Sequence, residues 1–156
     1  MSLGNLDELY REIVLDHYRT PRNRGELPVP PAIRVEGFNP LCGDEIAIYV
    51  DVRDGVLSDI RLSGHGCSIS QASSSLMSVA VKGHTLAEVR ATIERFKVMM
   101  TVGESDADAT ASVADLRTMG ELAALQGVAQ FPVRIKCATL AWNTLTQALD
   151  EAAASA

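Results

Sequence analysis

The spacing of apolar residues divides the chain into a helical start, a short group of strands and a helical second half. Apolar side chains recur at helical spacing over residues 6–18, which predicts an amphipathic helix. Pro21 ends this pattern, and Asn5 with Glu8 three residues later fits the N-terminal cap. We therefore expect the chain to begin with one surface helix.

Three strands are expected next. Residues 33–38 form a short candidate, and residues 45–52 alternate between apolar and mostly polar positions, as in a strand with one buried face. Asp54-Gly55 is a strong hairpin signal, and the apolar pattern resumes over residues 56–63. The pattern thus predicts a small antiparallel sheet that has one face covered by helices.

The second half of the chain is expected to be helical. Ser68 with Gln71, and Thr85 with Glu88, match capping boxes that open helices. Gly83 fits the C-terminal end of the first of these helices, because glycine adopts the left-handed conformation found there. The expected helices cover residues 69–82, 86–100, 115–126 and 138–153.

Two connections complete the expected architecture. Residues 101–115 carry several acids and no aromatic side chain, so we expect an exposed loop there. Phe131-Pro132 is expected to begin an extended segment that leads to Cys137. One helix, a sheet and then further helices is the order of an α+β protein, with a small antiparallel three-stranded sheet and helices packed on one face.

Composition narrows the range of functions. At 156 residues the chain has the size of one domain, spanning residues 1–156. Its net charge of −6 argues against nucleic acid as a partner, because such binding needs clustered positive charge. No apolar run could span a bilayer and the start lacks a secretory signal, so no membrane partner is expected. An odd number of cysteines favours a reducing compartment and a cytoplasmic location.

The cysteines are the candidates for chemistry. Cys67 and Cys137 are each expected just before a helix, where the partial positive charge of the N-terminus stabilises a thiolate. Cys42 lies in a glycine-flanked turn, with Asp44 two residues later. The four residues could form one site of three sulfurs and one oxygen. The alternative is three small buried apolar residues and a solvated turn acid, since the spacing matches no known zinc signature.

Charged neighbours of the cysteines have two interpretations. Arg134 and Lys136 flank Cys137, where positive charge would favour a thiolate or a bound persulfide. Ordinary solvated surface charge is the alternative for both. His65 lies two residues before Cys67, and we expect it to be an exposed loop histidine rather than a ligand.

Four segments of the chain, taken in order, match the motifs of one protein family. They read LYREIVLDHYRTPRN at 9–23, NPLCGD at 39–44, GCSISQASSSLM at 66–77 and LQGVAQFPVRIKCATLAW at 125–142. Together they resemble the IscU/NifU-like family of iron–sulfur cluster assembly proteins, and the last segment is similar to its SufU branch. The resemblance implies that Cys42, Asp44, Cys67 and Cys137 bind Zn²⁺.

The resemblance also implies a function. A SufU-type protein is expected to be a zinc-dependent sulfurtransferase that accepts persulfide sulfur from a SUF-type cysteine desulfurase, as its co-substrate and activator. A downstream SUF cluster-assembly scaffold is the second implied partner. Two departures from the scaffold branch support this choice: Lys136 stands where that branch has a histidine, and an acidic loop and helix insertion lies near 100–127.

We expect Cys42 to be the catalytic cysteine that accepts sulfur. It lies on a glycine-flanked turn, whereas Cys67 and Cys137 are expected to be fixed at helix starts. The alternative function is a scaffold that binds a [2Fe–2S] cluster through the same residues, since such clusters also prefer thiolates. Lys136 in place of a histidine argues against the scaffold, and a small structural zinc domain without chemistry is the third hypothesis.

Overall fold

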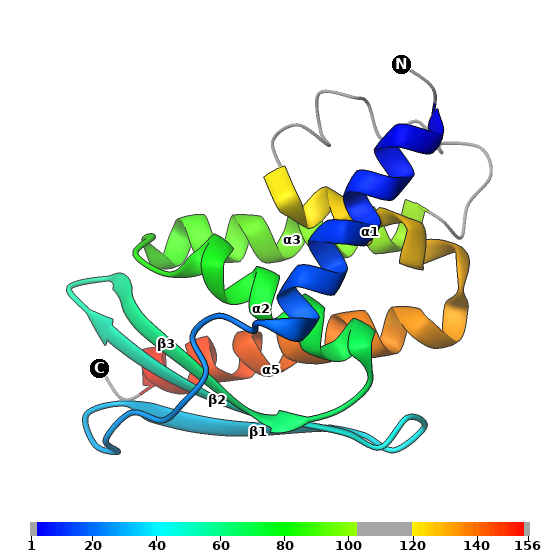
Figure 1. Cartoon of the computed structure of the whole chain (residues 1–156). Helices are drawn as coiled ribbons and strands as arrows, with labels where there is room; N and C mark the ends of the chain where they lie inside the picture. Colours follow the sequence, from blue (N-terminus) through cyan, green and yellow to red (C-terminus); the bar gives the residue numbers. More distant parts are fainter. Residues whose placement is uncertain (1–2, 103–119, 155–156) are drawn as a thin grey trace.

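The computed structural model describes residues 3–102 and 120–154, which form a three-stranded sheet and a layer of helices (Figure 1). The elements follow the order expected for an α+β protein. In chain order they are α1 (Leu3–Arg19), β1 (Ile33–Asn39), β2 (Asp44–Arg53), β3 (Val56–His65), α2 (Ser68–Val81), α3 (Leu86–Val102), the 3₁₀ helix η2 (Gly120–Gln130) and α5 (Pro132–Ala154).

The sheet is antiparallel with the strand order β1-β2-β3, as predicted. Asp54 and Gly55 form the turn between β2 and β3, and their φ angles of 52° and 76° are those of a hairpin turn with two left-handed residues. β1 and β2 are joined by a longer turn, and Asn39 is paired with Asp44 at its base. The two hairpins therefore place the β1–β2 turn and the start of α2 at the same end of the sheet.

Helices cover one face of the sheet, and α5 packs against β1 and β2 (Figure 1). Apolar side chains of β2 that alternate along the strand, among them Ile48 and Val50, are fully buried against this layer. Trp142 of α5 stacks on Phe96 of α3, with ring centroids 4.1 Å apart, at the centre of the core. The expected fold class, with helices on one face, is confirmed.

Two helices begin earlier than predicted, α1 by three residues and α2 by one. α1 begins at Leu3, so Asn5 lies inside the helix and is not its cap, although the helix ends before Pro21 as expected. α2 begins at Ser68, and its N-cap is Cys67 rather than Ser68. The Cys67 sulfur accepts a hydrogen bond from the Ser70 backbone N–H at 3.4 Å, the role that the Ser68 hydroxyl was expected to fill.

The other capping predictions are confirmed. Gly83 follows α2 with a φ of 84°, which a residue with a side chain rarely adopts. Thr85 and Glu88 form the reciprocal capping box of α3: the Thr85 N–H donates to Glu88 Oε1 at 3.1 Å, and the Glu88 N–H donates to Thr85 Oγ1 at 3.2 Å.

The segment before α5 is where the prediction was least accurate. Thr101 and Val102 belong to α3 and not to a loop, while the rest of the expected loop lies outside the described residues. Of the helix expected over 115–126, the described part is a 3₁₀ helix that continues past Gly127 to Gln130. Burial of apolar side chains on both sides of this glycine outweighs its low helix propensity. The insertion near 100–127 stays a prediction.

α5 begins six residues earlier than expected. Pro132 is its first residue, and the Phe131 carbonyl accepts hydrogen bonds from the N–H groups of Arg134 and Ile135. Proline suits the first position of a helix, where its missing N–H would have no partner inside the helix. The extended entry to Cys137 was therefore wrong, and Cys137 lies in the second turn of α5.

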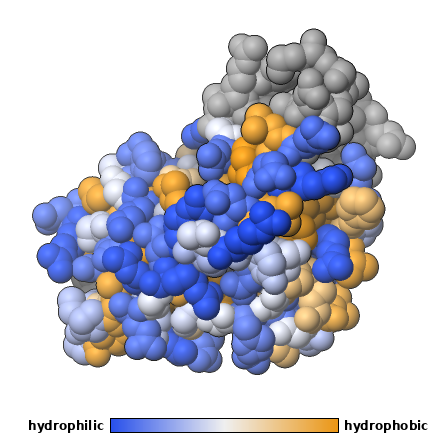
Figure 2. All heavy atoms as spheres, in the orientation of Figure 1, coloured by the Kyte–Doolittle hydropathy of each residue, from blue (hydrophilic) through white to orange (hydrophobic). Residues whose placement is uncertain are grey.

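No helix among residues 3–102 and 120–154 is long and apolar enough to cross a membrane. The face shown in Figure 2 is mainly hydrophilic, and hydrophobic atoms gather at its right-hand side, over the turn from η2 into α5. Large apolar side chains are exposed in that region, at Phe131 and Val133. This part of the surface lies close to Cys137 in the chain.

Candidate metal centre

Cys42 lies in the turn between β1 and β2. The turn is closed by Asn39, whose carbonyl accepts a hydrogen bond from the Cys42 N–H at 3.3 Å and whose Oδ1 accepts one from the Leu41 N–H at 3.2 Å. Gly43 has a φ of 67°, a left-handed conformation that lets the chain re-enter the sheet at Asp44. The Cys42 side chain is half-buried at the tip of this hairpin.

Asp44 is the first residue of β2, and it is completely buried. Its Oδ1 accepts a hydrogen bond from the Cys67 N–H at 2.8 Å, and its Oδ2 lies 3.9 Å from the Cys67 sulfur. Gly66 is required here, because a Cβ at that position would lie 2.6 Å from Asp44 Oδ1. The carboxylate is thus fixed against the N-terminus of α2, where the helix dipole favours negative charge.

Cys67 and Cys137 differ more than expected. Cys67 is the N-cap of α2, so its sulfur lies at the positive end of the helix dipole. Cys137 was expected at a helix start as well, but it lies inside α5, beyond the first turn, and is 1% exposed. Burial raises the pKa of the Cys137 thiol, and the hydrogen bond with Cys42 raises it further. Cys137 is therefore a thiol unless a cation stabilises the thiolate.

Three of the four side chains named from the sequence, those of Cys42, Asp44 and Cys137, lie close enough together to hold one metal ion, and the fourth, Cys67, contacts Asp44. The sulfurs of Cys42 and Cys137 lie 2.9 Å apart, and a carboxylate oxygen of Asp44 lies within 4.8 Å of both. Cys67 joins this group through its contacts with Asp44. Three sulfurs and one carboxylate oxygen suit tetrahedral Zn²⁺, so the chemistry of the donor set fits that ion.

Arg134 faces the cluster and Lys136 does not. Arg134 precedes Cys137 by three residues on α5 and thus shares its helix face. The charge of Cys67 and a hydrogen bond with Cys137 raise the pKa of the Arg134 guanidinium. Lys136 is exposed and forms no hydrogen bond or ion pair with any residue that the structure describes. Of the two auxiliary candidates, only Arg134 lies where it can act on the sulfurs.

Asn39 was missed by the sequence reasoning. It is 6% exposed, and its Nδ2 donates a hydrogen bond to the Cys137 sulfur at 3.8 Å. The Asn-Pro pair at 39–40 is a turn signal, so the closing of the turn could have been predicted. The contact with Cys137, 98 residues further on, carries no local signal.

The histidines lie outside the cluster. His65 is exposed near the end of β3, with Nε2 3.8 Å from Glu45 Oε2. His17 is buried and joins α1 to α2 and η2, through Ser75 Oγ at 2.7 Å and Glu121 Oε2 at 3.2 Å. Among the described residues, the donors of the cluster are therefore sulfurs and a carboxylate, and neither His65 nor His17 contributes.

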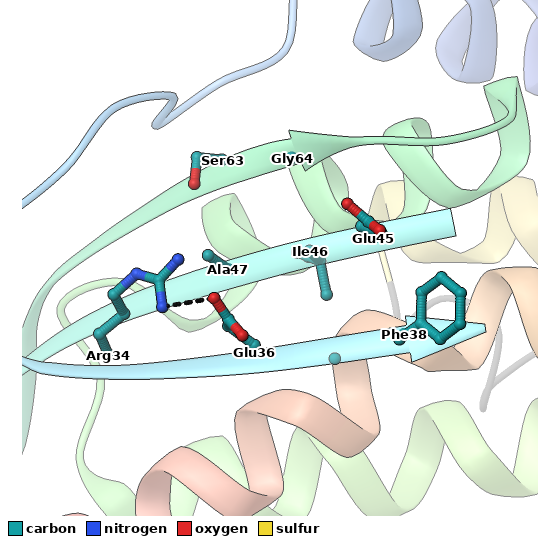
Figure 3. Close-up of a pocket in the computed structure, with 9 residues that line it drawn as sticks. Arg34, Glu36, Phe38, Glu45, Ile46, Ala47, Ser63 and Gly64 are labelled. Atoms are coloured by element: carbon teal, nitrogen blue, oxygen red, sulfur yellow. Dashed lines mark ion pairs between the residues drawn. The ribbon is translucent and has the colours of Figure 1, made fainter. Parts of the chain in front are cut away.

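A hollow of about 430 Å³ lies on the side of the sheet that faces away from the helices (Figure 3). Arg34, Glu36 and Phe38 of β1 project into it, and Arg34 pairs with Glu36 at 2.7 Å. None of the cysteines lines this hollow, and its Arg34–Glu36 pair lies within one strand. The candidate metal-binding residues therefore lie outside this hollow.

Comparison with known proteins agrees with the motifs. The NifU-like N-terminal domain matches residues 9–139. The chain belongs to this family. It is 42% identical to the zinc-dependent sulfurtransferase SufU of Bacillus subtilis, over 91% of this chain and 90% of that protein. It is 39% identical to the iron–sulfur cluster assembly scaffold protein IscU of Streptococcus pyogenes, over 98% of this chain and 90% of that one.

A solved structure shares the fold. It is a putative iron–sulfur cluster assembly scaffold protein for the SUF system from Fervidobacterium islandicum, with a TM-score of 0.76 and 29% sequence identity. The match covers 88% of this chain and 94% of that one. The sheet and helices described above are thus those of the IscU, SufU and NifU-like proteins.

Proposed function

We propose that this protein is a zinc-dependent sulfurtransferase that accepts persulfide sulfur from a SUF-type cysteine desulfurase for iron–sulfur cluster assembly. The observation that carries the proposal is that Cys42, buried Asp44 and Cys137 lie together beside the β1–β2 turn, with Cys67 in contact with Asp44. The 42% identity to a zinc-dependent sulfurtransferase supports it. A cation there would balance the charge of the buried carboxylate and of the thiolates beside it.

Cys42, Asp44, Cys67 and Cys137 are the residues that would bind Zn²⁺. When bound, the ion supplies positive charge that keeps the thiolates deprotonated at neutral pH. The buried Cys137 thiol needs that charge most, because burial disfavours its thiolate. Cys67 lies at the N-cap of α2, where the helix dipole favours negative charge.

Cys42 is the proposed acceptor because, of the two sulfurs in contact, it is more accessible than Cys137. Its thiolate attacks the outer sulfur of the donor persulfide, and a new S–S bond forms on Cys42. The S–S bond of the donor breaks, and its electron pair leaves with the thiolate of the donor cysteine. Arg134 supports this step, because its guanidinium faces the sulfurs and attracts the anionic persulfide.

The surroundings of Cys42 suit a protein partner. Leu41 beside it is 66% exposed, and Phe131 and Val133 are exposed at the start of α5. Exposed apolar side chains that gather around a site are typical of a protein interface. A desulfurase that docks here would cover the turn and deliver its persulfide to Cys42, and a downstream SUF scaffold would receive the sulfur next.

A second function has its own support. The 39% identity to a scaffold protein over 98% of this chain favours assembly of a [2Fe–2S] cluster on the same residues. Metal analysis of protein purified without air separates the two functions. Zinc without acid-labile sulfide supports sulfur transfer, and iron with acid-labile sulfide supports the scaffold.

The test of the main proposal uses the cognate desulfurase with cysteine as substrate. Wild-type protein should stimulate the desulfurase and carry a persulfide on Cys42, detected by alkylation and mass spectrometry. Cys42→Ser should lose both properties and keep part of its zinc through the other three ligands. Cys67→Ser is the matched control that weakens zinc binding and leaves Cys42 in place. A Cys42→Ser protein that still carries persulfide on another cysteine would refute the assignment.

A further inference from the structure

The contact between Cys42 and Cys137 exposes a bound persulfide to a side reaction. This inference rests on the proposed function. The two sulfurs lie 2.9 Å apart, so a persulfide formed on Cys42 lies beside a second cysteine. Cys137 can attack the inner sulfur of that persulfide and form a Cys42–Cys137 disulfide. The bond between the inner and outer sulfurs of the persulfide breaks. The outer sulfur leaves as hydrosulfide and takes the proton of the Cys137 thiol.

That side reaction needs no outside oxidant. The outer sulfur of the persulfide is reduced to hydrosulfide while the Cys137 sulfur is oxidised to the disulfide level, so the electrons balance within the protein. The delivered sulfur would be lost, and both cysteines would be blocked. A sulfur carrier with this geometry therefore needs a means of making Cys137 a poor nucleophile.

Besides Cys42 and Arg134, two further groups contact the Cys137 side chain. Its thiol donates to the Val133 carbonyl at 3.8 Å, one helical turn earlier on α5. Its sulfur accepts a hydrogen bond from Asn39 Nδ2, also at 3.8 Å. A donor on sulfur occupies a lone pair and withdraws electron density, so the sulfur attacks more slowly.

Asn39 links this contact to the reactive turn. Its Oδ1 accepts the Leu41 N–H at 3.2 Å, which fixes the residue before Cys42. The side chain is buried and carries no charge of its own. One amide thus holds both the backbone beside Cys42 and the sulfur of Cys137.

We propose that Asn39 is a positioning residue that preserves the persulfide on Cys42, because its amide holds the Cys137 sulfur in a hydrogen bond and prevents it from attacking.

Two substitutions separate this role from closing the turn. Asn39→Asp keeps an oxygen for the Leu41 N–H but loses the donor to sulfur, and Asn39→Ala loses both. Asn143→Asp, at an exposed position of α5, is the matched control. Each zinc-loaded protein is treated with inorganic polysulfide, freed of excess reagent and followed for hydrosulfide release. Intact mass measures the Cys42–Cys137 disulfide.

Both Asn39 variants should release hydrosulfide and form the disulfide about fivefold faster than wild type, the factor that one net hydrogen bond is worth. Asn143→Asp should match wild type. Adding Cys137→Ser to either Asn39 variant should return the release rate to the wild-type value. Equal rates in all single variants overturn the proposal. The proposal is also overturned if Asn39→Ala releases hydrosulfide quickly while Asn39→Asp releases it at the wild-type rate. That result would mean that Asn39 only closes the turn.

Two further measurements keep the inference testable. If the Asn39 variants do not fold, the side-chain amide spectrum of wild-type protein reports the contact directly. An Asn39 Nδ2–H resonance should move on Cys137→Ser, and an unmoved resonance overturns the proposal. Polysulfide loading also separates this inference from the proposed function. A protein that keeps a persulfide from polysulfide but takes none from any desulfurase refutes the function alone.

Discussion

Replacing Asp44 tests whether this carboxylate binds the metal or only supports the fold. Asp44 is completely buried, and one of its oxygens accepts the Cys67 N–H at 2.8 Å. Its other oxygen lies 3.9 Å from the Cys67 sulfur. Asp44→Asn can keep the first contact and removes the negative charge. Asp44→Ala removes both the contact and the charge, so the pair of variants separates the two roles.

The expected magnitudes follow from these contacts. A hydrogen bond to a charged group contributes about 1.5–3 kcal/mol, so Asp44→Ala should lower the free energy of unfolding of the metal-free protein by that amount. A neutral hydrogen bond contributes about 1 kcal/mol, so Asp44→Asn should lose about half as much. Loss of an outer-shell partner weakens metal binding roughly 10–100-fold, and loss of a ligand should weaken zinc binding by more than this in both variants.

Urea denaturation of the metal-free proteins measures the first quantity, and competition for zinc with a chelator measures the second. Asp54→Asn is the matched control, because asparagine also suits the left-handed turn at that exposed position. It should leave both quantities unchanged. If Asp44→Asn binds zinc as tightly as wild type while Asp44→Ala loses only stability, Asp44 supports the α2 start and is not a ligand.

Two more predictions concern the elements that carry the site. Gly37→Ala should lower the free energy of unfolding by about 1–3 kcal/mol in urea, because the added Cβ would overlap Thr144 Oγ1 of α5. Full stability in this variant would mean that β1 and α5 pack less closely than the structure has them. Glu88→Gln tests the α3 cap. Hydrogen bonding from the Thr85 N–H lowers the pKa of Glu88 in the folded protein. The ionised carboxylate therefore stabilises the fold at pH values above the ordinary pKa of a glutamate. The advantage of wild type in melting temperature should therefore be present at pH 7 and vanish as the pH falls through the lowered pKa.

Local signals in the sequence were enough for most of the fold. The Asp54-Gly55 turn and the Thr85–Glu88 capping box depend on neighbouring residues only, and both were predicted correctly. Pro132 misled because proline disfavours a helical residue before it and yet suits the first position of a helix. Whether residues 132–137 are extended or helical depends on how they pack against the rest of the protein, and no local sequence pattern predicts that packing.

The sequence predicted which candidate residues lie near one another, but not that the cysteines differ in burial. The motifs around Cys42, Cys67 and Cys137 identified them together with Asp44, although their spacing alone matched no metal signature. The burial of Cys137 inside α5 depends on where that helix begins, so it was missed with the helix start. Asn39 was missed because its contact with the Cys137 sulfur joins residues 98 positions apart.

The register of one hairpin sets the whole site. Asn39 and Asp44 are directly opposite each other at the base of the β1–β2 turn, so both side chains project from the same face of the sheet, toward the helices. Asn39 reaches Cys137 on α5, and Asp44 reaches Cys67 at the start of α2. A slip of one residue would turn a strand's side chains to the opposite face and break these contacts. The β1–β2 turn therefore has two effects: it leaves the Cys42 sulfur accessible, and through Asn39 it places a hydrogen-bond donor on the Cys137 sulfur.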